Sequence, residues 1–349
     1  MFVSRLTAWY QANRRFLPWR EETDAYRIWV SEIILQQTRV QQGLDYYIRF
    51  IGRFPDVRSL AEAEEREVLK YWQGLGYYTR ARNLHAGARW LWEHYGGKIP
   101  DTYEEIRKIK GVGAYTAAAI ASFAFNLPYP VVDGNVLRVV SRIFGVEAPV
   151  DAAEGRKAVE DIVRQYIPED NPALFNQAMM DFGALQCVPQ HPDCAACPFS
   201  GDCHAERYGL QAELPYKKHR NRQTDRYFWY WVFRRQGGVY LHRRQGNDIW
   251  KGLYEFPLTE SRHPLTEEQA IERQQYVDAD LLRSRQPLRV SPEYRHVLSH
   301  QVLHVRFAEV RLPDEAGLSG FLFAAEGVSE YPVSRLMEKY LNRSAADVL

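Results

Sequence analysis

The sequence predicts a protein of two domains, an all-α domain followed by a smaller α+β domain. A chain of 349 residues exceeds one ordinary hydrophobic core, so two cores are expected. Apolar residues recur at helical spacing from the start to about Tyr208, in segments such as 26–40, 66–71 and 115–125. Beyond that point the chain changes to aromatic and β-branched runs around glycine turns, which is typical of β-strands.

The composition is that of an ordinary globular protein. Hydrophobic residues make up 46% and charged residues 26% of the chain, which argues against disorder. The first residues lack the apolar core of a signal peptide and no stretch reaches the length of a membrane span, so we expect a cytoplasmic protein with no membrane partner. Because the net charge is only +1, any attraction to nucleic-acid phosphates must be local.

The first helical segments contain an acidic residue in apolar surroundings. Glu32 lies in segment 28–35, IWVSEIIL, which is apolar on nearly every side. Burial there would disfavour the ionised carboxylate and raise the pKa of Glu32, so that a proton stays available. On composition alone, a solvated surface charge is the more common role of a glutamate in a helix.

Two further segments mark helix starts. Segment 109–117, IKGVGAYTA, places Gly111 and Gly113 in a tight turn before a run of helix-forming residues. Backbone N–H groups at such a start can bind a DNA phosphate without basic side chains, although an ordinary helix connection is the alternative.

Segment 131–137, VVDGNVL, turns from an extended run into a helix at Asp133. A position near a helix N-terminus favours the charged form of Asp133, or makes it a simple cap.

All four cysteines fall in one short run, Cys187, Cys194, Cys197 and Cys203. A chain with no export signal and no other cysteine is not expected to form disulfides, so metal ligation is the better interpretation. One Cys-x-x-Cys flanked by lone cysteines differs from the separated pairs of most zinc sites, and four thiolates in one wrap suit a cubane cluster. Zinc remains the alternative, and either site would be structural because all four positions are filled by protein.

The predicted domains are 1–211 and 226–349, with a linker at 212–225. The linker region is rich in basic residues, which are solvated surface by default but would help a linker that crosses DNA: Lys217, Lys218, Arg220, Arg222 and Arg226. Segment 227–233, YFWYWVF, a Gly-Gly turn and segment 239–241, VYL, together predict a β-hairpin at the start of the second domain.

These motifs resemble those of one superfamily. The six-two-five spacing of the cysteines is similar to that of the endonuclease III and MutY glycosylases, and segment 109–117 resembles their helix-hairpin-helix. Segments 30–38, VSEIILQQT, and 132–136, VDGNV, look like those of the MutY family of adenine glycosylases, and the similarity runs through most of residues 10–210. The resemblance implies an all-α helix-hairpin-helix glycosylase domain with a [4Fe-4S] cluster in the loop 187–203.

The resemblance also implies the reaction. It points to a monofunctional DNA glycosylase that hydrolyses the N-glycosidic bond of adenine mispaired with 8-oxoguanine or guanine in base excision repair. Glu32 would be the general acid and later base, Asp133 would stabilise the oxocarbenium-like sugar, and Asn135 would assist the catalytic water. Tyr115 stands where the endonuclease III branch has a lysine, and tyrosine cannot form an imine, so base removal without efficient strand cleavage is expected.

A base must leave the duplex to reach a buried acid, so residues are needed to wedge the stack and hold the base. The glycine-punctuated loop 74–78, GLGYY, and the amides after Glu32 suit that task, with Gln37 and Tyr77 the best wedge candidates. The resemblance implies this set of pocket and DNA-binding residues in the first domain: Trp19, Arg20, Gln36, Gln37, Thr38, Leu75, Gly76, Tyr77, Gly111, Gly113 and Gln177.

The second domain resembles the MutT-like, nudix-related domain of the same family, through segments 239–244 and 247–257. A nudix hydrolase needs the glutamate cluster Arg-Glu-x-x-Glu-Glu to hold magnesium, and the sequence after Pro257 does not contain this pattern, so recognition is expected instead of hydrolysis. Segment 294–300, YRHVLSH, matches the family loop that meets the oxidised guanine. Leu298 replaces a common phenylalanine there, whereas Ser299 and His300 keep the polar groups.

The expected partner is double-stranded DNA with an adenine mismatch to 8-oxoguanine, bound by a monomer. Two other functions stay open. A bifunctional pyrimidine-lesion glycosylase and lyase is disfavoured by Tyr115 in place of the lysine and by the second domain. A non-catalytic DNA-binding module is disfavoured because Glu32 and Asp133 are both present.

Overall fold

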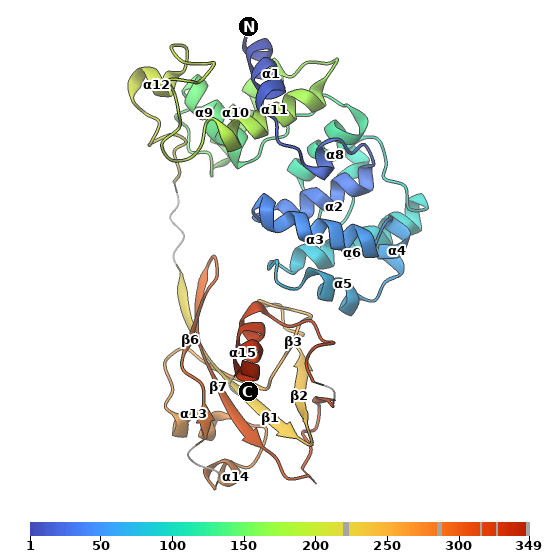
Figure 1. Cartoon of the computed structure of the whole chain (residues 1–349), viewed down its shortest axis with the longest axis vertical. Helices are drawn as coiled ribbons and strands as arrows, with labels where there is room; N and C mark the ends of the chain where they lie inside the picture. The colour runs from blue at the N-terminus through green and yellow to red at the C-terminus, as the bar shows by residue number, and fades with distance from the viewer. Residues whose placement is uncertain (219–222, 285–287, 315, 326, 347–349) are drawn as a thin grey trace. The chain divides into compact units, whose positions relative to one another are not determined.

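The computed structural model describes residues 1–218, 223–284, 288–314, 316–325 and 327–346 (Figure 1). Two of the basic linker residues, Arg220 and Arg222, lie outside these ranges. The chain divides into two compact units, Met1–Glu62 with Asn83–Arg220, and Ala63–Arg82 with Asn221–Leu349. The division between residues 220 and 221 falls inside the predicted linker. The assignment of 63–82 to the second unit was not predicted.

The first unit is helical, as its apolar periodicity predicts. Its elements are α1 (Phe2–Asn13), a 3-10 turn η1 (Pro18–Arg20), α2 (Ala25–Leu35), α3 (Val40–Arg53), α4 (Val57–Glu62), most of α6 (Thr79–Tyr95), α7 (Tyr103–Ile106), α8 (Ala114–Phe125), α9 (Gly134–Phe144), α10 (Ala153–Tyr166), α11 (Pro172–Leu185) and α12 (His204–Tyr208). In the described part of the chain no helix is long and apolar enough to cross a membrane.

Helix packing in this unit brings distant segments together. Helix α2 lies against α3 and α8, and α9 lies against α10, α11 and α12. Helices α1, α9, α10 and α11 share one core, in which Leu6, Val140 and Phe182 are fully or almost fully buried. Small residues permit close approach of α9 and α11, because a Cβ at Gly183 would lie 2.6 Å from the Cβ of Asn135. The segments that hold Glu32, Asp133 and the cysteines are therefore parts of one compact body.

One predicted helix is shorter than expected. The apolar spacing of 26–40 predicted a continuous helix, but α2 ends at Leu35 and α3 begins at Val40. Between them Gln37 has a φ of +57°, a left-handed conformation that interrupts the helix. The apolar pattern continues across the break because α2 and α3 both face the interior, so periodicity alone could not locate it.

The second unit is built on a β-sheet, with α5 (Glu65–Trp72) from the earlier segment. Its strands are β1 (Thr224–Arg235), β2 (Gly238–Arg243), β3 (Tyr254–Glu255), β4 (Leu258–Ser261), β5 (Arg289–Val290), β6 (Tyr294–Val297), β7 (Gln301–Arg311) and β8 (Leu322–Ala324), and its other helices are α13 (Glu267–Arg273), α14 (Ala279–Arg283) and α15 (Arg335–Ala346). The main path runs β3-β2-β1-β7-β5, with β4 paired to β1, β6 to β7 and β8 to β2.

The predicted hairpin is confirmed: β1 and β2 are antiparallel with Arg234 opposite Val239, across a turn in which Gln236 and Gly237 have positive φ. Strand β1 begins at Thr224, so the end of the predicted linker is strand. The continuous apolar run in β1 is explained by helices on both faces of the sheet (Figure 1). Alternate side chains pack toward α15 on one face (Phe228, Tyr230, Val232) and toward α13 and α14 on the other (Trp229, Trp231, Phe233).

Candidate active site

Glu32 is buried in the first unit, as predicted. Only 6% of its surface is exposed, and the hydroxyl of Tyr115 donates a 2.8 Å hydrogen bond to its Oε2. Burial raises the pKa of Glu32, and the charge of Asp133 adds to this, whereas the Tyr115 hydrogen bond and the charge of Arg20 lower it. Because burial outweighs the two opposing effects, Glu32 retains its proton to a higher pH than an ordinary glutamate.

Asp133 is the N-cap of α9. Its Oδ1 accepts a 2.8 Å hydrogen bond from the backbone N–H of Val136, and its Oδ2 accepts one of 2.8 Å from Nδ2 of Asn135. The cap position alone predicted a carboxyl that ionises readily, with a low pKa. That expectation was wrong, because the effect of burial on the pKa is larger than the effect of the cap. Burial raises the pKa of Asp133 in spite of these hydrogen bonds and the nearby charge of Arg138.

The two carboxyl groups share one electrostatic environment. The charge of Asp133 raises the pKa of Glu32, and burial together with the charges of both groups raises the pKa of the Tyr115 phenol well above its usual value. Tyr115 therefore stays protonated and acts as a donor. The structure brings Glu32, Tyr115 and Asp133, three residues far apart in the sequence, into one site.

Three more of the predicted pocket residues, Trp19, Arg20 and Gln177, lie in the first unit, and Arg20 and Gln177 are in contact. Trp19 is 93% buried and meets the ring of Tyr47 edge-on, at 5.4 Å between centroids. Gln177 on α11 accepts a 3.1 Å hydrogen bond from the hydroxyl of Tyr10 and donates one of 3.3 Å to the carbonyl of Arg20. The charge of Arg20 acts on both Glu32 and Tyr115, so Arg20 faces the same environment.

Asp181 is a site residue that the sequence analysis missed. It is fully buried on α11, and its Oδ1 accepts hydrogen bonds from Nη2 of Arg20 (2.9 Å) and from Nη2 of Arg15 (2.5 Å). The Arg20 side chain is itself only 8% exposed, and its Nε is buried without a partner. The signal was an acidic residue inside the apolar segment 178–183, AMMDFG, the same kind of signal that identified Glu32.

Arg138 was also missed, and it connects the site to the cysteine loop. Its Nη2 donates to Oδ1 of Asn135 (2.9 Å) and to the carbonyl of Gly183 (2.6 Å), while its Nε donates to the carbonyl of Cys187 (2.8 Å). Asn135 in turn holds Asp133. Arginines four residues apart in the apolar run 136–142, VLRVVSR, were the available signal.

The four cysteines line a single pocket together with Phe182, Ala205 and Arg142. All four are free cysteines of intermediate exposure. Arg142 places Nη1 3.5 Å from the Cys187 sulfur and donates to the carbonyl of Val188 at 2.7 Å. Across the described residues no group of three or more Cys, His, Asp or Glu side chains is arranged to hold a metal ion.

The turn before α8 has the geometry expected of its glycines. Gly111 has a φ of +81°, and a Cβ there would lie 2.5 Å from the Cβ of Asn83, so only glycine fits. Gly113 is the exposed N-cap of α8, and a Cβ there would meet no described atom within 4 Å. The backbone at this helix start is therefore open to a ligand, and Tyr115 follows in the first turn.

The amides after α2 point in different directions. Gln36 donates a 3.2 Å hydrogen bond from Nε2 to the hydroxyl of Thr116 on α8, so it binds inside the protein. Gln37 is exposed and has a left-handed backbone conformation. The hydroxyl of Thr38 donates weakly to the carbonyl of Gln36, at 3.4 Å.

The remaining predicted residues lie in the second unit. Leu75 is buried, Gly76 has a φ of +76°, and Tyr77 is 49% exposed with its hydroxyl hydrogen-bonded to that of Ser299. Ser299 and His300 are exposed between β6 and β7, whereas Leu298 packs partly against the core of this unit.

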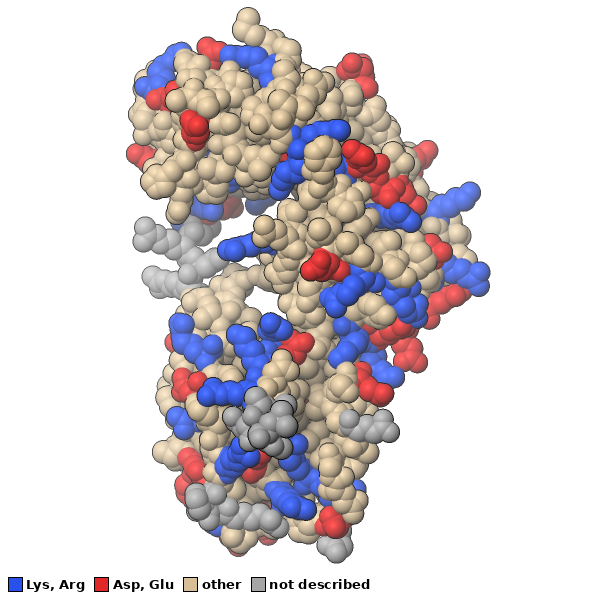
Figure 2. Space-filling view, in the orientation of Figure 1, with Lys and Arg blue, Asp and Glu red and all other residues tan. Residues whose placement is uncertain are grey.

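Basic side chains are spread over both units and are interspersed with acidic ones (Figure 2). Lys217 and Lys218 are exposed, as expected of a basic linker. Arg226 forms ion pairs with Asp248 and Glu260 instead.

The chain matches two domain families. Residues 30–167 match the HhH-GPD superfamily base excision DNA repair protein, and residues 228–343 match the NUDIX domain. The adenine DNA glycosylase of Buchnera aphidicola subsp. Acyrthosiphon pisum is 31% identical over 314 residues, which cover 90% of this chain and 87% of that protein. The adenine DNA glycosylase of Rattus norvegicus is 43% identical over 222 residues, which cover 61% of this chain and 43% of that protein.

Solved structures agree on the fold of the helical part. A thermostable thymine-DNA glycosylase is similar with a TM-score of 0.56 and 30% identity, covering 59% of this chain and 95% of that one. A trapped endonuclease III–DNA covalent intermediate gives a TM-score of 0.53 at 22% identity, covering 60% of this chain and 95% of that one, which supports the fold alone. The chain therefore belongs to the adenine DNA glycosylase family of base excision repair enzymes, with an HhH-GPD glycosylase domain followed by a NUDIX domain.

Proposed function

We propose that this enzyme removes adenine mispaired with 8-oxoguanine from double-stranded DNA, with Glu32 as the proton donor and Asp133 as the group that stabilises the sugar cation. The observation that carries the proposal is the buried Glu32 carboxyl, hydrogen-bonded by Tyr115 and within the electrostatic influence of Asp133. Two carboxyl groups with separate roles are what cleavage of a glycosidic bond requires.

Glu32 supplies the proton. Its Oε2 is engaged by Tyr115, which leaves Oε1 as the oxygen that carries and transfers the proton to a ring nitrogen of the extruded adenine. Protonation makes the base a better leaving group, and the ionised Glu32 can then take a proton from the attacking water. Burial maintains the protonated form before the reaction.

Asp133 is held rigidly for its role. Its two oxygens are fixed by the Val136 N–H and by Asn135, and Asn135 is fixed in turn by Arg138. An ionised carboxylate that cannot rotate away stabilises positive charge as it develops on the sugar, without a reorganisation cost at that moment. The cation itself favours ionisation of Asp133, which offsets the rise in its pKa caused by burial.

A structural [4Fe-4S] cluster bound by Cys187, Cys194, Cys197 and Cys203 is part of the proposal. The four sulfurs line one pocket, and the Arg142 guanidinium beside Cys187 suits a group with negatively charged thiolates. Closure of four thiolates around the cluster would bind the loop to α9 and α11 and leave no open position for substrate. The visible absorption spectrum of the purified protein tests this, because zinc gives no visible absorption band and would leave the protein colourless.

Base removal without strand cleavage is the direct test of the reaction. The protein is incubated in excess with a duplex that holds adenine opposite 8-oxoguanine, and the product is analysed with and without alkali. We expect an abasic strand that breaks only after alkali, because Tyr115 cannot form an imine. Strand breaks that appear without alkali would show the bifunctional reaction instead, and an intact strand after alkali would leave only the DNA-binding module.

Selection of 8-oxoguanine is assigned to the exposed loop of Leu298, Ser299 and His300. Ser299→Ala is compared with wild type on duplexes that pair adenine with 8-oxoguanine or with guanine. We expect the preference for 8-oxoguanine to fall, because the hydroxyl supplies a hydrogen bond that only the oxidised base can use. An unchanged preference would contradict this role of the loop.

A further inference from the structure

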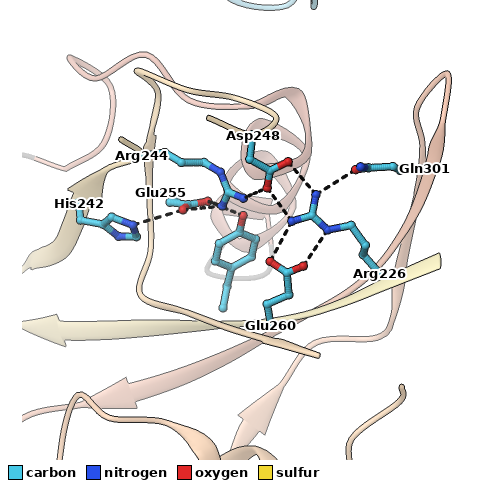
Figure 3. A network of polar contacts seen from close by, with 8 residues as sticks. Arg226, His242, Arg244, Asp248, Glu255, Glu260 and Gln301 are labelled. Atoms are coloured by element: carbon cyan, nitrogen blue, oxygen red, sulfur yellow. Dashed lines mark hydrogen bonds and ion pairs between the residues drawn. The ribbon is translucent and has the colours of Figure 1, made fainter. Parts of the chain in front are cut away.

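Arg226 is the centre of a polar network in the second unit (Figure 3). Its Nε donates to Glu260 at 2.7 Å and its Nη2 to the same carboxylate at 2.9 Å. Nη2 and Nη1 also donate to the two oxygens of Asp248, at 2.6 and 3.0 Å, and Nη1 donates to Oε1 of Gln301 at 3.0 Å. A guanidinium has five N–H donors, and these five bonds use all of them.

The network leaves Arg226 with no N–H donor that could bind a DNA phosphate. Asp248, Glu255 and Glu260 face the two guanidinium groups of Arg226 and Arg244, so the local charge is not positive. The Arg226 side chain is only 16% exposed. Lys217 and Lys218 are exposed and are the available basic residues in the described part of the linker. Arg226 is therefore paired with acidic side chains, unlike the exposed Lys217 and Lys218 of the same basic segment.

Gln301 is the residue through which the network reaches the lesion loop, Leu298–His300. It is the first residue of β7 and directly follows His300. Two neighbours of Arg226 hold the same loop by its backbone, since Nε2 of Gln223 donates to the carbonyl of Leu298 at 2.8 Å and the N–H of Thr224 donates to that of His300 at 3.1 Å. The start of β1 thus fastens the loop at both ends.

Asp248 connects the network to the other side of the hairpin. Arg244 donates from Nη2 to Oδ2 of Asp248 at 2.6 Å and from Nη1 to Glu255 at 2.8 Å, which fixes the segment that follows β2. In that segment Trp250 packs against His296 on β6, at 5.8 Å between ring centroids. The strand that enters the loop therefore contacts Trp250, two residues after Asp248, and the residue that leaves the loop, Gln301, is bonded by Arg226.

We infer that Arg226 is a positioning residue for the Leu298–His300 loop and that it sets the preference for 8-oxoguanine without contacting DNA. The inference rests on the proposed function, in which this loop reads the oxidised base. Loss of the Arg226–Gln301 bond frees the Gln301 side chain at the start of β7, where the Gln301 carbonyl accepts a 2.8 Å hydrogen bond from the N–H of Leu298. A small displacement passed on to Ser299 removes a hydrogen bond that depends on its position.

The test compares Arg226→Gln with a matched control. Arg283 also donates three hydrogen bonds to acidic side chains, Glu268 and Asp280, but it lies on α14 and does not contact the loop. Single-turnover rates are measured on adenine:8-oxoguanine and adenine:guanine duplexes. We expect Arg226→Gln to reduce the rate ratio between the two duplexes by about tenfold and Arg283→Gln to leave it unchanged. Equal ratios for wild type and Arg226→Gln would overturn the inference.

The salt dependence of DNA binding separates positioning from phosphate contact. Each phosphate ligand that is lost lowers the slope of log affinity against log salt concentration by about 0.9. We expect Arg226→Gln to keep the wild-type slope, and Lys217→Gln with Lys218→Gln to reduce it. A slope reduced by Arg226→Gln would make this residue a phosphate ligand and contradict the inference.

The second variant, Gln301→Leu, shows whether a folding defect explains the result for Arg226→Gln. It removes one hydrogen-bond acceptor of Arg226 and keeps both of its ion pairs. We expect the same fall in the rate ratio with an unchanged melting temperature. If Ser299→Ala lowers the ratio but Arg226→Gln and Gln301→Leu do not, the inference fails and the proposed function stands. If Ser299→Ala leaves the ratio unchanged, the reading of 8-oxoguanine by this loop fails first.

Discussion

The hydroxyl of Tyr115 controls how readily Glu32 releases its proton. Its 2.8 Å hydrogen bond stabilises the ionised carboxylate and so lowers the pKa of Glu32, against the larger effect of burial. Arg20 acts in the same direction as Tyr115. Burial therefore favours the protonated form of Glu32, whereas Tyr115 and Arg20 favour its ionised form. Such opposing effects suit a residue that must first give a proton and then take one.

Tyr115→Phe should make Glu32 a weaker acid. Without the hydrogen bond the pKa of Glu32 rises further, so the protonated form persists to higher pH. The alkaline limb of the single-turnover pH profile should move upward, while the rate at neutral pH changes by less than about tenfold. Tyr95→Phe is the matched control, because Tyr95 donates a similar 2.6 Å hydrogen bond to Glu105 in a position that is only partly buried. A limb that stays in place or moves to lower pH would contradict the role of Tyr115.

At the scale of elements, helix α9 begins at a residue with two functions. Asp133 caps the helix through Val136 and is also the proposed site of negative charge. Asparagine caps a helix about as well as aspartate but has no charge, so substitution can separate the two functions.

Asp133→Asn should therefore keep stability and lose activity, with a fall in the single-turnover rate of about 10²–10³-fold. Asp133→Ala should lose the same activity and in addition about 1 kcal/mol of unfolding free energy, measured by urea denaturation. Thr102→Ala removes the cap of α7 and is the control that should change stability alone. A normal excision rate in Asp133→Asn would show that the negative charge of Asp133 is not needed for the reaction.

The N-terminal segment and α11 are joined by a buried ion pair. Asp181 accepts from Arg15 and Arg20, so its neutralisation leaves two cations facing a fully buried amide. Asp181→Asn should lower the unfolding free energy by about 3 kcal/mol, because a buried charge loses its partner. The exposed pair of Asp161 and Lys157 is the control, and Asp161→Asn should cost less than about 1 kcal/mol. Similar small losses for both variants would show that the Asp181 pair carries little stability.

For the molecule as a whole, local patterns predicted what depends on local chemistry. Helical and strand periodicity predicted the change from helices to a sheet, the cap sequence predicted the start of α9, and the Gly-Gly turn predicted the β1–β2 hairpin. The apolar segment around Glu32 predicted its burial, because a glutamate flanked by large apolar residues on all sides of a helix has no solvent to face.

Features that depend on tertiary contacts could not be predicted in the same way. The pKa of Asp133 depends on how deeply α9 is buried, which the cap sequence does not contain. The basic character of Arg226 is cancelled by Asp248 and Glu260, which are distant in sequence. The assignment of 63–82 to the second unit depends on contacts with residues that follow more than a hundred positions later.

The single-turnover rate of Glu32→Gln on a duplex with adenine opposite 8-oxoguanine tests the central claim most directly. Glutamine keeps the size of the side chain and can still accept the Tyr115 hydrogen bond, but it has no proton to give. We predict that excision slows by at least about 10²-fold while affinity for the duplex is retained. A rate within about threefold of wild type, less than general acid catalysis contributes, would contradict the assignment of Glu32 as the proton donor.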